Sequence, residues 1–199
     1  SPTVVGSKIF LSTADERSQS QGVVAFDRET GRQLWLTPIS QGGFPKTHPK
    51  NTHATPTVAC DGERLFVTFH HHDKLTLAAL DLDGKRLWTE EIGPYAPRLY
   101  EYGYAPSPLL YRDNVILCAD YEGGGYLVSH DRATGKRVWR SKRPVSYSFS
   151  SPVVATVAGK EQLLLSGCAV VAAYDPATGA ELWSTPGTTM ATCGTMVWD

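Results

Sequence analysis

One phrase of about ten residues occurs four times in this chain of 199 residues, and each copy ends in tryptophan. The copies read FDRETGRQLW, LDLDGKRLW, HDRATGKRVW and YDPATGAELW, and they end at Trp35, Trp88, Trp139 and Trp183. A repeat spacing of 44 to 53 residues is typical of arrays of supersecondary units rather than of heptads or collagen triplets. Each period therefore predicts one structural module.

Every module contains four short apolar runs, which predict four strands. In the first module these runs are PTVV, KIFLST, GVVAFD and the segment that ends at Trp35, and the later modules follow the same order. No convincing helical pattern of ten residues or more lies between the runs, so parallel-sheet folds are disfavoured. We therefore expect an all-β chain with modules at approximately residues 1–40, 54–92, 105–143 and 150–185, and the start of a fifth at 193–199.

The repeated phrase has the composition of a tight turn between the last two strands of each module. Its aspartates can accept backbone N–H groups two residues ahead, and its glycines supply the positive φ that a bulged hairpin turn requires. The second copy is one residue shorter and predicts a tighter hairpin. The turn residues are Asp27, Gly31, Asp81, Gly84, Asp131, Gly135, Asp175 and Gly179.

The strand after each turn predicts how the modules pack. Adjacent side chains on a strand point to opposite faces, so Leu34 and Trp35, or Val138 and Trp139, are expected to bury against different partners. A sheet that is apolar on both faces must be covered twice, and identical modules cover one another most simply as radial blades. We therefore predict a β-propeller of four-stranded antiparallel blades, with a two-sheet sandwich as the alternative.

The pattern Ala-x-Asp-x-x-x-Gly-x-x-x-Trp, at Ala25–Trp35 and Ala173–Trp183, resembles the tryptophan-docking repeat of quinoprotein (PQQ-type) propellers. Module three departs from it by Ser129 in place of alanine. The longer string NTHATPTVACDGERLFVTF, followed by LAALDLDGKRLW, resembles PQQ-like repeat proteins of planctomycete-type bacteria. The resemblance implies a propeller of seven or eight blades, export to the periplasm or cell surface and, in the enzymes of the family, PQQ bound on calcium.

Four modules fill the chain, so we expect about four blades of a larger propeller. End blades with an uncovered apolar face then imply association or further chain. A closed four-bladed ring is the alternative. No signal peptide is recognisable, and a chain that starts within a module would not carry one.

Charge and composition exclude some classes of partner. A net charge of −1 and a pI near 6.6 leave no polybasic surface for nucleic acid or anionic lipid. The apolar runs are too short to cross a bilayer. Among the cysteines, Cys60 and Cys118 are expected to be buried thiols, while Cys168 and Cys193 fall on the same side of their blades and are either free or bridged.

The variable loops predict the functional face. In an up-and-down blade the connection between the second and third strands emerges on the same side as the connection to the next blade, opposite the repeated turn. Long irregular loops on a rigid scaffold are where binding residues usually lie. We therefore expect any partner to bind on this loop face.

Histidines on that face are candidate metal ligands. His70, His72 and Asp73 combine imidazoles at alternate positions with a carboxylate, and His48 and His53 belong to the adjacent connection. The alternative is a polar hairpin tip with solvated imidazoles. His130, which replaces an apolar residue in module three, is expected to be packed or hydrogen-bonded within its strand.

An aromatic loop supplies the candidate partner-binding residues, together with His48 and His53. Tyrosine and arginine are enriched where proteins or sugars bind, although the same residues also pack over a neighbouring blade. The loop residues are Tyr95, Arg98, Tyr100, Tyr102 and Tyr104.

Two functions follow from these features. The first is a non-catalytic scaffold that binds a protein or glycan partner through the loop face, and it requires no cofactor and no catalytic residue. The alternative is a fragment of a PQQ-dependent dehydrogenase. The resemblance implies an adjacent cysteine pair over the cofactor in such enzymes, but the four cysteines here are isolated, and no calcium-binding set can be recognised.

Overall fold

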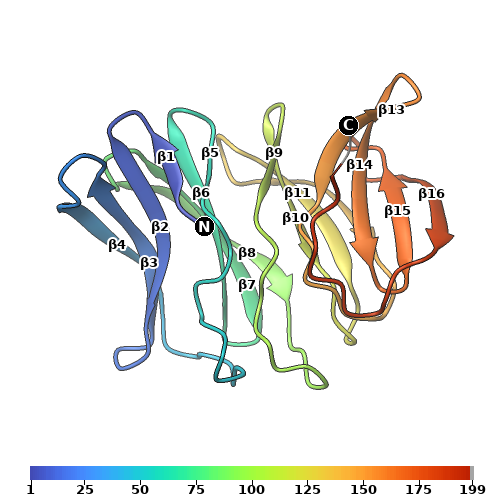
Figure 1. Cartoon of the computed structure of the whole chain (residues 1–199), viewed down its shortest axis with the longest axis horizontal. Coiled ribbons are helices and arrows are strands. Elements are labelled where there is room, and N and C mark those ends of the chain that lie inside the picture. Colours follow the sequence, from blue (N-terminus) through green and yellow to red (C-terminus); the bar gives the residue numbers. More distant parts are fainter. Residues whose placement is uncertain (198–199) are drawn as a thin grey trace. The chain divides into compact units, whose positions relative to one another are not determined.

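A computed structural model describes residues 1–197 of the chain. Over this range sixteen strands form four sheets of four antiparallel strands, shown in Figure 1. The chain divides into two compact units, the first comprising Ser1–Ala96 with Tyr100–Pro108 and the second Pro97–Leu99 with the described residues from Leu109 onward. Each unit contains two sheets.

The first unit holds sheets one and two. Sheet one consists of β1 (Thr3–Val5), β2 (Lys8–Asp15), β3 (Ser20–Asp27) and β4 (Gln33–Gln41). Sheet two consists of β5 (Ala59–Cys60), β6 (Arg64–His71), β7 (Lys74–Asp81) and β8 (Arg86–Pro94).

The second unit holds sheets three and four. Sheet three consists of β9 (Leu109–Tyr111), β10 (Asn114–Ala119), β11 (Tyr126–Asp131) and β12 (Arg137–Lys142). Sheet four consists of β13 (Val153–Val157), β14 (Lys160–Gly167), β15 (Val170–Tyr174) and β16 (Glu181–Pro186). In all four sheets the spatial order of the strands is their order in the sequence. The prediction of four-stranded antiparallel modules is therefore confirmed, although the predicted start of a fifth extends beyond the described residues.

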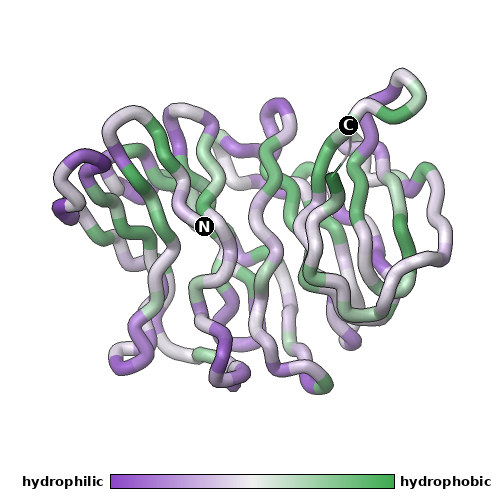
Figure 2. Tube along the Cα trace, viewed as in Figure 1, coloured by the Kyte–Doolittle hydropathy of each residue, from purple (hydrophilic) through white to green (hydrophobic). Residues whose placement is uncertain are grey.

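The core of each unit lies between its two sheets. Figure 2 shows hydrophobic residues along the strands and hydrophilic residues at the hairpin turns. In the first unit Phe10 and Val23 pack with Leu65, Val67 and Phe69, which are all fully or almost fully buried. The core of the second unit is formed by the following residues of sheets three and four: Tyr111, Ile116, Cys118, Leu127, Leu163, Leu165, Ala172 and Tyr174.

The outer strands differ from the prediction that both of their faces are buried. Leu34, Leu87, Val138 and Leu182, which each precede a repeat tryptophan, are exposed. An outer strand is hydrogen-bonded to a neighbouring strand along one edge only. In the first sheet of each unit, the face of the outer strand that carries the tryptophan packs on the second sheet of that unit. Alternation correctly predicted that the two side chains point apart, but not that one of the two directions is left uncovered.

The repeated turn has the predicted geometry. In the first copy Asp27 Oδ1 accepts the N–H groups of Glu29 and Thr30 at 3.1 and 2.8 Å, and Gly31 has φ +69°. The other turn glycines have φ between +74° and +85°. A β-bulge precedes the turn aspartate in every sheet, at Ala25/Phe26, Ala79/Leu80, Ser129/His130 and Ala173/Tyr174. The bulged hairpin is therefore confirmed.

A tryptophan of the first sheet in each unit docks on the turn glycine of the second. A Cβ atom added at Gly84 would lie 2.6 Å from the indole of Trp35, and one added at Gly179 would lie 2.4 Å from that of Trp139. Only glycine fits beneath these rings. The repeat is thus a packing device between consecutive sheets.

Of the residues singled out within the strands, His130 and Cys118 are buried as expected, whereas Cys60 is only half-buried. His130 is buried, and its Nδ1 lies 2.7 Å from the carbonyl oxygen of Gly135. Cys118 is buried in β10, and Cys60 is half-buried in β5. These side chains belong to the packing of their strands.

Candidate partner-binding loops

Two loops of the first unit are tied together at the end opposite the repeated turns. One is the connection 42–58 between β4 and β5, and the other is Tyr100–Pro108. The N–H of His48 donates to the carbonyl of Glu101 at 2.8 Å, and the Asn51 amide donates to the carbonyl of Tyr102. Lys46 forms an ion pair with Glu101 at 2.7 Å. These contacts fix the loops against each other.

Two of the four predicted tyrosines project from this pair of loops into solvent. Tyr100 and Tyr102 are 38% and 42% exposed, and their rings are nearly parallel, with centroids 6.0 Å apart and an interplanar angle of 16°. The ring of His48 lies 5.2 Å from that of Tyr102. The structure therefore brings His48 together with two of the aromatic candidates on an exposed surface.

The other two tyrosines are buried beneath the loops. Tyr95 and Tyr104 meet edge to face at 5.3 Å, and the Tyr95 ring also meets that of His70 at 4.9 Å in a T-shaped contact. The Tyr95 hydroxyl donates to the carbonyl of Gly103 at 3.3 Å. Tyr95 and Tyr104 thus anchor the aromatic loop, and neither offers a surface to a partner.

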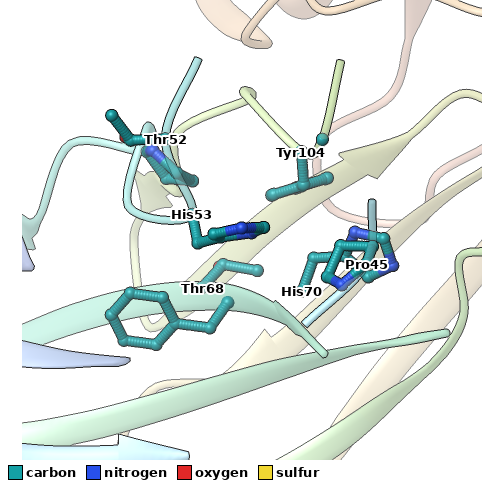
Figure 3. Close-up of a pocket in the computed structure, with 9 residues that line it drawn as sticks. Pro45, Thr52, His53, Thr68, His70 and Tyr104 are labelled. Carbon is teal, nitrogen blue, oxygen red and sulfur yellow. The ribbon is translucent and has the colours of Figure 1, made fainter. Parts of the chain in front are cut away.

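A small enclosed cavity lies beside this anchor. Figure 3 shows the side chains of His53, Thr68, His70, Tyr104 and Pro45 among those that line it. Its volume is about 10 Å³, close to the minimum that holds one water molecule. The cavity is too small for an organic ligand.

His70 is the least satisfied polar residue of this cluster. The side chain is 4% exposed, and within residues 1–197 neither ring nitrogen has a hydrogen bond of acceptable geometry. Burial lowers the pKa of His70 from 6.5 to about 4, and the backbone of Tyr95 and the charge of Asp73 oppose this effect. His70 is therefore neutral at physiological pH, and the alternative expectation of solvated imidazoles is wrong for this residue.

His70, His72 and Asp73 do not converge as metal ligands. His72 and Asp73 form the two-residue turn between β6 and β7 with φ of +50° and +56°, and the His72 ring lies against Gly43 and 3.1 Å from Nδ1 of His71. The carbonyl of Asp73 accepts the N–H of Tyr95 at 2.9 Å. Across the part of the chain that the structure describes, no group of three or more His, Cys, Asp or Glu side chains could hold a metal ion.

Arg98 belongs to the second unit. Its backbone N–H and that of Leu99 both donate to Oε1 of Glu122, the latter at 2.9 Å. These hydrogen bonds lower the pKa of Glu122 against the raising effect of burial, which is the larger single influence. Within the second unit, Arg98 and Leu99 are therefore held by a carboxylate of the β10–β11 connection.

The second unit contains a buried ion pair that the sequence did not reveal. Arg143 Nε and Nη2 donate to the two carboxylate oxygens of Asp120 at 3.0 and 2.9 Å, and Nη1 donates to the Tyr174 hydroxyl at 2.9 Å. Both charged side chains are fully buried. Burial opposes the charge of Arg143, but the bonds to Asp120 outweigh it and raise the Arg143 pKa. The sequence feature that could have indicated this pair is Asp120, which stands directly after the apolar run NVILCA.

The three cysteines of the second unit are free thiols. Cys168 is buried, and burial raises its pKa to about 12, whereas Cys193 is exposed. The bridge between Cys168 and Cys193 that the loop positions allowed is not formed. Cys118 is fully buried, and burial raises its pKa well above its usual value.

Comparison with known families identifies the repeat. A family model described as outer membrane protein assembly factor BamB matches residues 19–198. The chain belongs to this family of PQQ-like repeat β-propellers. No curated protein sequence matches the chain.

Solved structures share the fold of this PQQ-like repeat propeller at low sequence identity. A quinohemoprotein alcohol dehydrogenase from Comamonas testosteroni is 18% identical with a TM-score of 0.62, and covers 94% of this chain and 34% of its own. The quinohemoprotein alcohol dehydrogenase ADHIIG from Pseudomonas putida HK5 is 15% identical with a TM-score of 0.61, and covers 93% and 33%. A europium-containing methanol dehydrogenase is 16% identical with a TM-score of 0.63, and covers 93% and 41%. The chain thus spans about a third of the length of the first two.

The cysteines and the possible metal ligands of this PQQ-like repeat propeller do not form a site that could hold a quinone bound to a metal ion. Cys60, Cys118, Cys168 and Cys193 are separate free thiols, so an adjacent cysteine pair cannot form. No metal-ligand group of three occurs among residues 1–197.

Membrane-spanning helices were also sought in residues 1–197, and none of the length and hydrophobicity required was found there.

Proposed function

We propose that this chain is a non-catalytic binding module of the cell envelope that holds a protein partner on the loops of its first unit. The observation that carries the proposal is the exposed, nearly parallel pair Tyr100 and Tyr102 on a loop that is already fixed. A family described by an assembly factor supports a protein partner. The family resemblance supports a periplasmic or other extracytoplasmic location.

The rigidity of the loop favours binding. Ordering a flexible loop on association costs free energy, and a preformed loop avoids that cost. Here the N–H of His48, the amide of Asn51 and the ion pair of Lys46 with Glu101 hold the loop before any partner arrives. The tyrosines are therefore presented in one arrangement.

Each residue of the loop has a distinct role in the proposed site. Tyr100 and Tyr102 would supply the buried contact area, because tyrosine combines a large apolar ring with a hydroxyl and loses little conformational entropy. His48 packs against Tyr102 and holds its ring. Glu101 and Lys46 lie at the rim, where charges mainly affect the rate of association.

The test compares partner capture by the intact chain and by a Tyr100→Ser/Tyr102→Ser double variant. The immobilised proteins are exposed to an envelope extract, the captured proteins are identified by mass spectrometry, and the affinity of the leading partner is measured by calorimetry after purification. We expect the double variant to weaken binding by at least about tenfold, because aromatic residues dominate interface energetics.

A Val145→Ser variant is the matched control, since Val145 is an exposed apolar residue of the second unit. The control should bind like the unmodified chain. Equal affinity of the double variant would contradict the proposal. Nearly parallel tyrosines also suit the flat face of a sugar ring, so an array of envelope glycans is probed in parallel. Tyrosine-dependent binding to a glycan alone would assign that ligand class instead of a protein.

A further inference from the structure

The outer strand of sheet three differs in charge from the other outer strands of the described chain. Strand β12 carries Arg137, Arg140 and Lys142 and no acidic residue. Strand β8 has one cation and two glutamates, β16 has one glutamate, and β4 has no charged residue. Of these four edges, only β12 is purely basic.

The cations of β12 belong to a longer basic segment. Residues 132–143 contain six of the 19 lysines and arginines of the chain and no aspartate or glutamate. Two of the six, Arg132 and Arg143, are paired with aspartates outside the segment. Arg137 and Lys142 are exposed and form no ion pair within residues 1–197. The net charge of −1 therefore hides a local excess of cations, which is smaller than the polybasic surfaces that bind nucleic acid.

One face of β12 is open to solvent because of its place on the outer strand. Side chains alternate along a strand, so Val138, Arg140 and Lys142 share the face opposite the repeat tryptophan. In the first unit, where sheet one packs against sheet two, the residue of sheet two that corresponds to Val138 is Leu87. Leu87 is 44% exposed, close to the 51% of Val138. A preceding sheet thus leaves this face of an outer strand uncovered.

A groove follows the same strand. Its volume is about 780 Å³, and it is lined mostly by β12, together with Gly124, Gly125 and Tyr126 of the neighbouring hairpin. None of the described residues that line it is acidic. The Arg140 guanidinium lies 3.7 Å from the centre of the buried Tyr126 ring, and this cation–π contact holds it in place. The groove is therefore large enough for a peptide segment and already has one cation positioned along it.

The backbone of β12 can form hydrogen bonds along this groove. The strand is the last of its sheet and pairs with β11 along one edge only. At its end the N–H of Arg143 donates toward β11, to the carbonyl of Gly125 at 2.9 Å. The direction of the backbone groups alternates along an antiparallel strand, so the N–H and carbonyl groups of Arg140 and Lys142 point away from β11. An added strand would meet donors and acceptors directly beside the two cations.

We propose that β12 binds an extended acidic peptide of a partner protein as an additional strand of sheet three. The peptide backbone pairs with the outward N–H and carbonyl groups of Arg140 and Lys142, and its carboxylates at alternate positions accept hydrogen bonds from their side chains. The positive charge selects the occupant, because a basic strand would be repelled and a neutral one would leave both cations unpaired. This surface belongs to the second unit and the tyrosine loop to the first, so the two proposals are tested independently.

Charges on an edge strand can also have a purely protective role. Lysine and arginine on a sheet edge discourage pairing with foreign strands. That role requires no groove and no particular sign of charge, and it predicts that an acidic peptide binds no better than a neutral one. The sign dependence of peptide binding therefore separates the two explanations.

Fluorescence anisotropy with synthetic peptides tests the proposal. The probe is a fluorescein-labelled peptide of about eight residues that alternates glutamate and valine, which is long enough to span β12. Peptides with glutamine or lysine in place of glutamate are titrated in parallel with the intact chain. We expect the glutamine peptide to bind at least about tenfold more weakly and the lysine peptide not to bind. Binding of the acidic peptide should also weaken as salt rises from about 0.05 to 0.5 M.

Substitutions in the chain locate the site. Arg140→Gln/Lys142→Gln should weaken binding of the acidic peptide by at least about tenfold. Both side chains are exposed, and an unchanged circular dichroism spectrum would show that the fold is kept. Arg28→Gln/Lys50→Gln is the matched control, since it removes the same net charge from exposed positions of the first unit. The control should bind to within about twofold of the unmodified chain.

Two backbone-methylated peptides distinguish strand pairing from attraction between charges alone. Each carries N-methyl groups at alternate residues, and the two sets are complementary, so one set faces β12 and the other faces solvent. One peptide should bind at least about tenfold more weakly than the other, because methylation removes the donors and blocks close approach.

Several results would overturn the proposal. They are equal binding of the two methylated peptides, equal binding of the glutamate and glutamine peptides, and a control variant that binds as weakly as Arg140→Gln/Lys142→Gln. Phosphatidylglycerol vesicles and oligothymidylate are titrated in the same way. Tighter binding of either one, lost in the Arg140→Gln/Lys142→Gln variant, would assign the surface to lipid or nucleic acid instead of a peptide.

Discussion

The two units place different chemistry at the same position of the repeat. In sheet two, Phe66 pairs with the inner strand at Ala59, and His70 follows four residues later. In sheet three, Ile116 pairs with the inner strand at Leu109, and Asp120 follows four residues later. Four positions after the repeat tryptophan, sheet two has the apolar Ile92, whereas sheet three has the charged Arg143.

The difference shows two ways of burying a polar group. The first unit buries His70 in its neutral form, without a well-formed hydrogen bond, beside a small cavity and an aromatic cluster. The second unit buries two full charges, and each carboxylate oxygen of Asp120 receives a hydrogen bond from Arg143. A neutral group tolerates missing partners at a moderate cost, but a buried charge does not.

Removal of Arg143 should have the largest effect. Arg143→Ala leaves Asp120 buried and unpaired, and we expect the free energy of unfolding to fall by about 3–5 kcal/mol. Urea denaturation followed by circular dichroism measures the change. The double variant Asp120→His/Arg143→Ile places in the second unit the residue types found at positions 70 and 92 of the first unit. It should regain most of the free energy of unfolding that Arg143→Ala loses. A fall below about 1 kcal/mol for Arg143→Ala would contradict the importance of the pair.

Acid should weaken the first unit through His70. Its pKa is about 4 in the folded chain and near 6.5 when exposed, so between these values the unfolded state binds more protons. The free energy of unfolding should therefore fall as the pH drops through this window, by up to about 3 kcal/mol from His70. Urea midpoints between pH 7 and pH 4 measure it, at about half-unit steps.

A His70→Leu variant separates this effect from other histidines. Burial also lowers the pKa values of His53 and His71, so both add to the same trend. The variant should retain only their share and lose stability less steeply as the pH falls. Identical slopes for the variant and the unmodified chain would show that His70 is not the titrating group.

The smallest expected effect is the difference in stability loss between phenylalanine substitutions at the two docked tryptophans. Trp35→Phe removes an indole N–H that donates to Leu82, whereas Trp139→Phe removes one that has no partner among the described residues. Both variants lose similar ring area. Trp35→Phe should therefore be more destabilising by about 0.5–1 kcal/mol in paired urea titrations. A reversed order would indicate that the Leu82 bond contributes nothing.

The sequence predicted the modules because their signal is local and repeated. Aspartate, glycine and tryptophan at fixed spacing specify a turn and the strand that follows it, so the bulged hairpins and four-strand sheets could be derived. Leu34 shows the limit of that reasoning. Alternation assigns a side chain to a face, but coverage of the face depends on a neighbouring sheet.

The candidate site was only partly predictable for a related reason. Four tyrosines within one loop look alike in sequence, yet hydrogen bonds and ring contacts bury Tyr95 and Tyr104 and leave Tyr100 and Tyr102 exposed. Asp120 and Arg143 lie 23 residues apart and match no motif. His70 and His72 are of a residue type that binds metals, but with the tight turn at His72 and Asp73 their side chains do not converge on one site.

The bulge before each turn also bears on aggregation. Every outer strand is a free sheet edge, where unpaired backbone groups could recruit a foreign strand and start a fibril. A bulge twists such an edge and interrupts its regular pairing. Strand β4 has no charged residue, and it combines two bulges with Pro38. Strand β16 has one bulge, a single charge at Glu181 and a proline only at its last position, Pro186, so it is the edge from which we expect ordered aggregates to grow when sheet four loosens.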